Sequence, residues 1–139
     1  MSRNIGSPKP SATGRTARSL VTAYVSAYQV KDVAAYLSLF SKGADYVDYG
    51  VQVHKKIRQL KEELRLSFHR EEFHLVIHSF FVSTDGRFAA LMGSYTDTER
   101  SGRAISVPIV SILEFHNGEV IKESLYYDGS DFKRRFFAA

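Results

Sequence analysis

The sequence of 139 residues contains no cysteine, no tryptophan and only three prolines. Without cysteine, the chain has no disulfide, no thiolate nucleophile and no cysteine-ligated zinc site. No apolar run approaches the roughly 20 residues of a membrane-spanning helix, and no apolar stretch near the N-terminus resembles a secretory signal. We therefore expect a cytoplasmic protein that is not bound to a membrane, with a core large enough to fold without covalent staples.

The net charge of +4 is concentrated near the N-terminus. Residues 1–18 contain four basic and no acidic residues, whereas the rest of the chain has 15 of each sign. No basic stripe could follow a phosphate backbone, so we expect no nucleic-acid partner. Because residues 1–14 are rich in Ser, Pro and Gly, we expect a flexible basic tail over residues 1–15, with a transit peptide as the alternative. A single domain is expected over residues 16–139.

Apolar residues recur at helical spacing in the first half of the chain. Leu20 and Tyr24 belong to one apolar helix face, and an aspartate before the next apolar run is a typical helix N-cap. The expected elements are a helix from about Thr16, a short helix that Asp32 caps and Lys42-Gly43 ends, a strand from Ala44 to Tyr49, and a helix from about Lys56 to Phe68.

The second half is rich in β-branched and aromatic residues, which is typical of strands. Asp85-Gly86 and Asn117-Gly118 favour tight hairpin turns, and Pro108 indicates a bulge or a sheet edge. The expected elements are strands over Phe73–Val82, Arg87–Thr96, Ala104–Phe115 and Glu119–Tyr127, and a short C-terminal helix that carries Phe132, Phe136 and Phe137.

Several short segments carry a resemblance to a known family. They are Tyr24-Val25, Lys31-Asp32-Val33, Phe40, Ala44-Asp45-Tyr46-Val47-Asp48, His54-Lys55-Lys56-Ile57, Phe115-His116-Asn117-Gly118-Glu119-Val120 and Leu125-Tyr126-Tyr127-Asp128. Over about residues 17–137, these segments and the order of elements resemble nuclear transport factor two, ketosteroid isomerase and the SnoaL-like polyketide cyclases. The resemblance implies an α+β fold, in which a cone-shaped, curved, mixed or antiparallel sheet is wrapped by three to four helices around one apolar pocket.

The resemblance to ketosteroid isomerase implies catalytic roles for three polar residues. Asp48 matches the isomerase's general base and Tyr24 its oxyanion-hole tyrosine, and such a site combines a carboxylate with hydrogen-bond donors in apolar surroundings. Glu123 alternates with Leu125 and Tyr127, so it is expected to face the pocket as a second acid–base group, unless a one-residue register shift turns it to solvent. The structural alternatives are a loop-capping Asp48 and a core Tyr24.

Two positions depart from the family pattern. Ser111 stands where the isomerase, the cyclases and limonene-type epoxide hydrolases have an aspartate, and Leu125 stands where the hydrolases have a second one. Epoxide hydrolysis by that mechanism is therefore not expected. The Ser111 hydroxyl, inside an apolar strand, needs either a ligand or a protein group as its partner.

The expected pocket wall combines apolar residues with a few polar ones. No metal is expected, because His74 and His78 are roughly 13 Å apart along a strand, too far to share an ion. No other cofactor is expected either. The expected substrate-binding residues are Tyr28, Phe40, Tyr46, His54, Leu64, Phe68, His78, Ser111, Leu113, Leu125 and Tyr127.

Two classes of function are consistent with these residues. The first is a cofactor-independent isomerase or cyclase that moves protons on an apolar carbonyl compound of polyketide or terpenoid type, with a dehydratase as a variant of the same site. The second is a non-catalytic module that binds a small ligand or dimerises. The resemblance also implies a homodimer.

Overall fold

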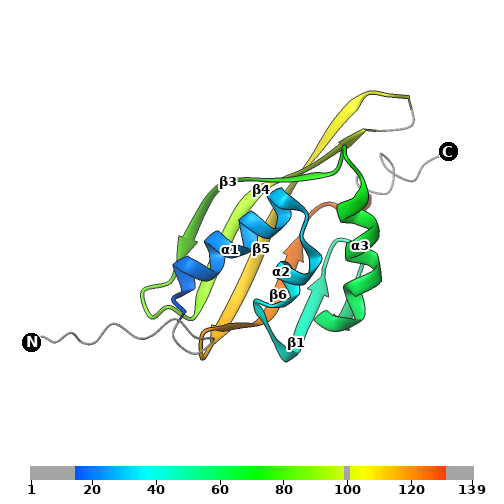
Figure 1. The fold of residues 1–139 in the computed structure, drawn as a ribbon. Helices are drawn as coiled ribbons and strands as arrows, with labels where there is room; N and C mark the ends of the chain where they lie inside the picture. The colour runs from blue at the N-terminus through cyan, green and yellow to red at the C-terminus, as the bar shows by residue number, and fades with distance from the viewer. Residues whose placement is uncertain (1–14, 99–100, 131–139) are drawn as a thin grey trace, which may run out of the picture.

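The computed structural model describes residues 15–98 and 101–130, which form an α+β fold with helices on one side of a curved sheet (Figure 1). The elements are α1 (Ala17–Val30), α2 (Val33–Leu37), β1 (Phe40–Asp48), β2 (Val53–Lys56), the 3₁₀ helix η2 (Ile57–Leu60), α3 (Lys61–His69), β3 (His74–Val82), β4 (Phe88–Thr98), β5 (Ala104–His116) and β6 (Glu119–Tyr126). The expected C-terminal helix, and the expected tail up to residue 14, lie outside the described residues.

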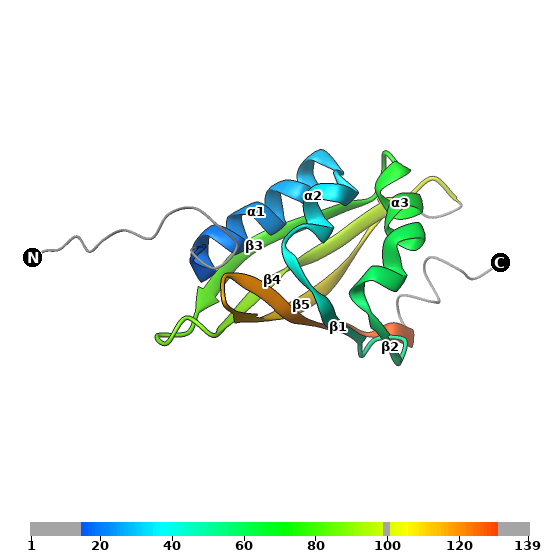
Figure 2. The same ribbon diagram turned by 60° about the horizontal axis from the view of Figure 1, so that its bottom comes forward.

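Within the described residues, the sheet has six strands in the order β2-β1-β6-β5-β4-β3, and β1 and β6 are its one parallel pair. It curves around α1, α2 and α3 without closing, as Figure 2 shows. At the centre of the sheet, Glu123 on β6 lies opposite Tyr46 on β1 and Leu113 on β5. This architecture confirms the predicted cone-shaped α+β fold with a mixed sheet.

The first two helices begin at local capping signals. The Thr16 side chain accepts a hydrogen bond from the backbone N–H of Ser19, and the Ser19 hydroxyl accepts one from the backbone N–H of Thr16, which makes a reciprocal capping box. The Asp32 carboxylate accepts from the backbone N–H of Ala35 at 2.9 Å, as the sequence predicts. Between these two N-caps, α1 ends at Val30, and its C-cap residue Lys31 has the left-handed conformation, with φ of 58°.

Three boundaries differ from the prediction. α2 ends at Leu37, and β1 begins at Phe40, so Lys42-Gly43 lies inside a strand. The physical reason is long-range pairing, because Phe40 lies opposite Val120 of β6 and a register shift absorbs the residues up to Asp45. Residues 53–56, where no strand was predicted, form the edge strand β2, and the third helix, predicted from about Lys56, starts as the 3₁₀ turn η2.

The expected turn and edge signals agree with the structure. Asn117 and Gly118 have φ of 51° and 72°, the left-handed pair of a tight hairpin turn. Pro108 lies opposite Ser94 of β4, whereas pairing with β6 begins only at Val110. Pro108 therefore lies on a stretch of β5 that has one open side, where a missing N–H is tolerated.

The backbones of β3 and β4 approach closely at Gly93. The β3 register shifts between Ile77 and Ser79, opposite Gly93 and Met92. A Cβ at Gly93 would lie 1.8 Å from the carbonyl oxygen of Val76. Glycine is therefore required here by the close contact between strands.

We expect Gly93→Ala to lower the free energy of unfolding by about 2–4 kcal/mol, because strand backbone must move to admit the methyl group. Gly43→Ala is the matched control, since it is also a strand glycine and a Cβ there meets nothing within 4 Å. That change should stay within about 0.5 kcal/mol of the wild type. Urea unfolding of both variants measures the difference, and equal stabilities would contradict the close-contact argument.

Candidate functional site

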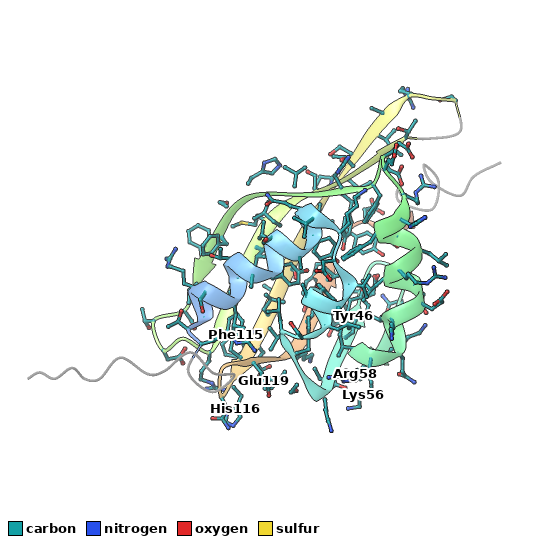
Figure 3. The ribbon with its side chains drawn as sticks, viewed as in Figure 1. Tyr46, Lys56, Arg58, Phe115, His116 and Glu119 are labelled. Carbon is teal, nitrogen blue, oxygen red and sulfur yellow. The ribbon has the colours of Figure 1, made fainter. Side chains whose placement is uncertain are left out.

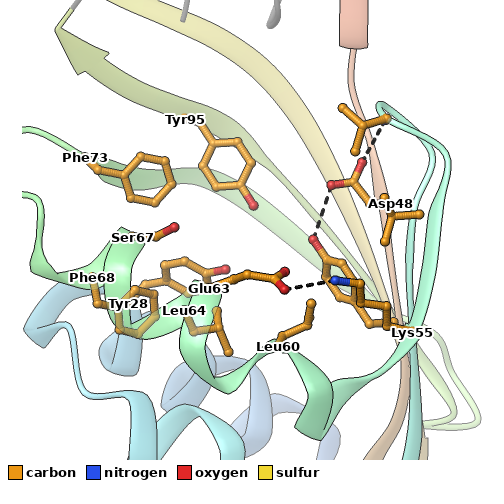
Figure 4. Close-up of a pocket in the computed structure, with 13 residues that line it drawn as sticks. Tyr28, Asp48, Lys55, Leu60, Glu63, Leu64, Ser67, Phe68, Phe73 and Tyr95 are labelled. Carbon is orange, nitrogen blue, oxygen red and sulfur yellow. Dashed lines mark hydrogen bonds and ion pairs between the residues drawn. The ribbon is translucent and has the colours of Figure 1, made fainter. Parts of the chain in front are cut away.

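An open pocket of about 230 Å³ lies between α3, the end of β1, β2 and β4 (Figure 4). Most of its wall is apolar, with three tyrosines, one aspartate and a lysine–glutamate pair as its main polar groups. It is lined by Tyr28, Tyr46, Asp48, Val51, Val53, Lys55, Leu60, Glu63, Leu64, Ser67, Phe68, Phe73 and Tyr95.

Asp48, the last residue of β1, is nearly buried, with 9% of its surface exposed. Its Oδ1 accepts hydrogen bonds from the backbone N–H groups of Gly50 at 3.0 Å and Val51 at 3.1 Å. Its Oδ2 accepts from the Tyr127 hydroxyl at 2.9 Å and, more weakly, from the Tyr46 hydroxyl at 3.4 Å. Asp48 thus closes the turn after β1 and also lines the pocket.

The phenol groups of the pocket are kept in their protonated form. Burial is the main cause that raises the pKa values of Tyr28, Tyr46 and Tyr95. The negative charges of Glu123 and Asp48 raise the pKa of Tyr46 further. All three hydroxyls can therefore donate hydrogen bonds at physiological pH.

Tyr46 reaches the pocket from the inner side of the sheet. Figure 3 shows it between α2 and α3, whereas Lys56 and Arg58 lie at the rim of the fold. Lys55, next along β2, forms an ion pair of 2.9 Å with Glu63 of α3 at the pocket wall. The interior of the pocket is therefore mainly aromatic, and the charges of Lys55 and Glu63 at its wall are paired with each other.

A second carboxyl group, that of Glu123, lies deeper and is completely inaccessible to solvent. It accepts hydrogen bonds from the Tyr24 hydroxyl at 2.5 Å, from the Tyr36 hydroxyl and, at 3.4 Å, from the Ser111 hydroxyl. Within residues 15–98 and 101–130, no salt bridge reaches it. We call Glu123, Tyr24, Tyr36 and Ser111 the inner cluster.

The pKa of Glu123 is raised, and burial is the largest cause. The hydrogen bonds from Tyr24, Tyr36 and Ser111 stabilise the carboxylate and oppose this rise, whereas the charge of Asp48 adds to it. The net effect is upward because a buried charge without a cation is costly even when it is hydrogen-bonded.

The structure divides the sequence-predicted site residues into three groups. Asp48, Tyr28, Tyr46, Leu64 and Phe68 line the pocket. Tyr24, Glu123 and Ser111 lie behind its wall in the inner cluster, and Tyr127 holds Asp48. The remaining predicted residues do not line the pocket, and they are Phe40, Leu113 and Leu125 in the core, His54 on β2 and His78 on β3.

The two histidines were expected as donors in the pocket wall, and the structure places them elsewhere. The His54 side chain is 66% exposed and lies 3.5 Å from Asp45, because residue 54 lies on the edge strand β2. His78 lies at the β3 register shift and faces a separate groove between β3 and α1. Both therefore lie outside the pocket.

Sequence reasoning missed the pocket residues Tyr95, Phe73, Val51, Val53, Lys55, Leu60, Glu63 and Ser67, as well as Tyr36 of the inner cluster. Strand alternation with the buried Leu91 and Gly93 could have placed Tyr95 on the inner face. The partner of Tyr36 could not have been found, because Glu123 is 87 residues away in the chain.

Two further features concern only the part of the chain that the structure describes. No three His, Cys, Asp or Glu residues there are arranged to hold a metal ion. None of the helices there is long and apolar enough to span a membrane.

Comparison with known proteins identifies relatives at the level of the domain. A family model described as a SnoaL-like domain matches residues 21–123. None of the curated proteins matches the chain.

Solved structures share the fold at low sequence identity. An NTF2-like protein of unknown function from Burkholderia pseudomallei has a TM-score of 0.72 and 18% identity, covering 88% of this chain and 98% of that chain. A protein with a ketosteroid isomerase-like fold from Catenulispora acidiphila, in complex with trimethylamine, has a TM-score of 0.69 and 19% identity, covering 84% of this chain and 90% of that chain. TerC, co-crystallised with polyporic acid, has a TM-score of 0.71 and 15% identity, covering 86% of this chain and 96% of that chain.

The raised pKa of Glu123 predicts a pH-dependent effect of Glu123→Gln on stability. The folded protein binds this proton more tightly than the unfolded chain, whose pKa is near 4.5. The raised pKa therefore makes its full contribution to the free energy of unfolding of the wild type below pH 4.5. This contribution is lost as the pH rises through the folded-state pKa, by up to about 1.4 kcal/mol per pH unit. The glutamine variant cannot lose it, so its stability relative to the wild type should increase over that range.

Urea unfolding of both proteins from pH 4 to pH 8 measures this difference, with Glu119→Gln as a control on the same strand. The control should follow the wild type, because Glu119 is partly exposed at the end of the hairpin. Parallel curves for Glu123→Gln and wild type would contradict the raised pKa.

Proposed function

The chain belongs to the SnoaL-like domain family of the nuclear transport factor two-like superfamily, and we propose that it is a cofactor-independent isomerase or cyclase. It acts by proton transfer on an apolar carbonyl compound. One observation carries this proposal, namely that the Asp48 carboxylate lines the same apolar pocket as the hydroxyl-bearing side chains of Tyr28, Tyr46 and Tyr95. A carboxylate base and neutral phenol donors are the two groups that enolisation of a carbonyl compound requires.

Asp48 is the base of the proposed reaction. It removes a proton from the carbon next to the carbonyl, and its fixed position at the end of β1 holds the carboxylate ready for that transfer. The carbonyl oxygen accepts a hydrogen bond from Tyr28 or Tyr95, which lie on the pocket wall. The sequence-based proposal gave that role to Tyr24, but the Tyr24 hydroxyl donates to Glu123 instead.

The walls of the pocket support a compact, apolar and ring-containing substrate. Leu60, Leu64, Phe68 and Phe73 supply flat hydrophobic surface, and Phe73 stacks on Tyr95 with ring centres 5.3 Å apart. The volume of about 230 Å³ lies below the usual range for drug-sized ligands. The SnoaL-like family favours the polyketide class over the terpenoid class.

A non-catalytic ligand-binding module is the second candidate, and the hydrogen bonding of Asp48 favours it. The two backbone N–H groups and the Tyr127 hydroxyl occupy both carboxylate oxygens, as in a structural turn cap. A dehydratase would use the same base and the same enolate. Proton exchange at the pocket separates the binding module from both enzymes.

We further propose that the outer face of the sheet forms a homodimer interface. Phe81, Ala90 and Ile112 lie side by side on β3, β4 and β5, and Phe81 is 66% exposed. Tyr49 and Tyr126 continue this apolar face with stacked rings 4.6 Å apart. An apolar face of this kind is unfavourable in water, and a two-fold axis would cover it with the same face of a second copy.

Asp48→Asn should slow the exchange of 2-tetralone α-protons with D₂O by at least about 100-fold, because the amide cannot accept the proton. The change should leave the melting temperature nearly unaltered, since the amide oxygen can still accept from the N–H groups of Gly50 and Val51. Proton NMR of 2-tetralone with wild type and variant measures the exchange.

Asp45→Asn is the matched control for this experiment. It lies on the same strand but pairs with Lys56 outside the pocket, so the exchange rate should stay at the wild-type value. Exchange that survives Asp48→Asn would remove Asp48 from the role of base. No exchange by the wild type, with 2-tetralone still bound, would support the binding module.

Phe81→Lys should convert the proposed dimer to a monomer, because the new charge would be buried in the apolar interface. Leu66→Lys is the control, since this exposed residue lies on α3, away from the outer sheet face. Light scattering coupled to size-exclusion chromatography gives the mass of each protein. A monomeric wild type, or a dimer that tolerates the lysine, would contradict the proposed interface.

A further inference from the structure

We propose that the pocket also binds a small quaternary ammonium cation, seated between its aromatic rings and the Asp48 carboxylate. This class of ligand differs from the carbonyl compounds of the proposed reaction, and its binding requires no catalysis. Because both classes would occupy the same pocket, the cation would compete with the carbonyl compound.

The wall of the pocket carries more negative than positive charge. Among the described residues, its charged members are Asp48, Glu63 and Lys55, which give a net charge of −1. Lys55 and Glu63 form an ion pair of 2.9 Å with partly exposed side chains. Asp48 is nearly buried, and within residues 15–98 and 101–130 no salt bridge reaches it. A buried carboxylate without a cation is costly, so a cationic ligand would supply the missing opposite charge.

The hydrogen bonds of Asp48 define the kind of cation that fits. An ionised carboxyl group has about four lone-pair sites on its two oxygens. The donors that reach Asp48 are the N–H groups of Gly50 and Val51, at 3.0 and 3.1 Å, and the hydroxyls of Tyr127 and Tyr46, at 2.9 and 3.4 Å. The carboxylate therefore has little capacity left to accept from a ligand, although its charge remains. A quaternary ammonium group suits it because that group has no N–H to donate, whereas a primary ammonium group would keep unsatisfied donors.

The surface around this charge is mainly aromatic. The face of an aromatic ring attracts cations, and quaternary ammonium groups are typical ligands of several rings that act together. The volume of about 230 Å³ is suited to a small cation. The rings come from five different segments of the chain, and they belong to Tyr28 of α1, Tyr46 of β1, Phe68 of α3, Phe73 before β3 and Tyr95 of β4.

Two of these rings lie close to the carboxylate. The Tyr46 hydroxyl is 3.4 Å from Oδ2 of Asp48. The Tyr95 ring lies 6.3 Å from the ring of Tyr127, whose hydroxyl donates to the same oxygen at 2.9 Å. Figure 4 shows Tyr95 and Asp48 in the wall of the same pocket. A cation bound there would contact aromatic surface and lie near the negative charge at the same time.

NMR titration of the ¹⁵N-labelled protein with choline as the probe tests the cation site. The neutral compound 3,3-dimethyl-1-butanol has the shape of choline without the charge, and ethanolamine has the charge with N–H donors. We expect choline to bind the wild type at least about tenfold more tightly than either compound. The amide signals of Gly50 and Val51, which hold Asp48, should shift on binding.

Asp48→Asn should weaken choline binding by at least about tenfold and leave the affinity for 3,3-dimethyl-1-butanol unchanged, because only the charge is lost. Asp45→Asn is the matched control, since Asp45 lies on the same strand and pairs with Lys56 outside the pocket. The control should bind both compounds like the wild type. Equal losses for choline in the two variants would overturn the role of Asp48.

The Lys55–Glu63 pair gives a second test that leaves Asp48 intact. Lys55→Met removes a positive charge from the wall and should tighten choline binding about twofold or more, whereas Glu63→Gln removes a negative charge and should weaken it by a similar factor. Both variants break the same ion pair. A purely structural effect would therefore move both affinities in the same direction.

The cation site is overturned if choline and 3,3-dimethyl-1-butanol bind equally well, or if the two variants of the ion pair act in the same direction. Choline should also slow the exchange of 2-tetralone protons by competition, and an unchanged rate with choline bound would place choline outside the pocket. Exchange by the wild type without choline binding rejects the cation site and leaves the proposed function standing. Choline binding at the pocket without any exchange supports the cation site and rejects catalysis.

Discussion

The fold depends on how a carboxyl group is accommodated at the centre of its sheet. Glu123 is fully buried on β6, and it is tolerated because hydroxyl groups reach it from α1, α2 and β5. Tyr24 and Tyr36 therefore do more than fill the core, since each ties a helix to the middle of the sheet. Loss of either hydroxyl would leave the carboxyl group with one partner fewer in a region without water.

The two carboxyl groups of the interior differ because their surroundings differ. Asp48 accepts from backbone N–H groups at the end of β1 and lines an open pocket. Among the described residues, Glu123 accepts hydrogen bonds only from hydroxyl groups, and it has no exposed surface. Burial favours the neutral form of a carboxyl group, and it is the largest cause of the raised pKa of Glu123. The two carboxyl groups also differ in their access to a ligand, because Asp48 lines the pocket and Glu123 lies behind its wall.

Curvature gives the two faces of the sheet different uses. The inner face, with the helices, encloses the pocket and the inner cluster. The outer face carries exposed apolar side chains such as Phe81 and Tyr126. At Gly93 the backbones of β3 and β4 approach closely beside the register shift in β3, and an irregularity of this kind bends the strand and adds to the curvature of the sheet. Ligand binding and self-association, as proposed, therefore use opposite sides of the sheet.

The sequence alone determined the features that depend on neighbouring residues. The cap at Asp32 and the turn at Asn117-Gly118 follow from local conformational preferences, and strand alternation predicted that Glu123 and Leu125 share the inner side of β6, where both are buried. Only the tertiary structure decided which groups meet, because parallel pairing of β1 with β6 and the formation of β2 join distant segments. For the same reason it decided that Tyr24 reaches Glu123 behind the pocket wall, a contact between residues that are 99 positions apart.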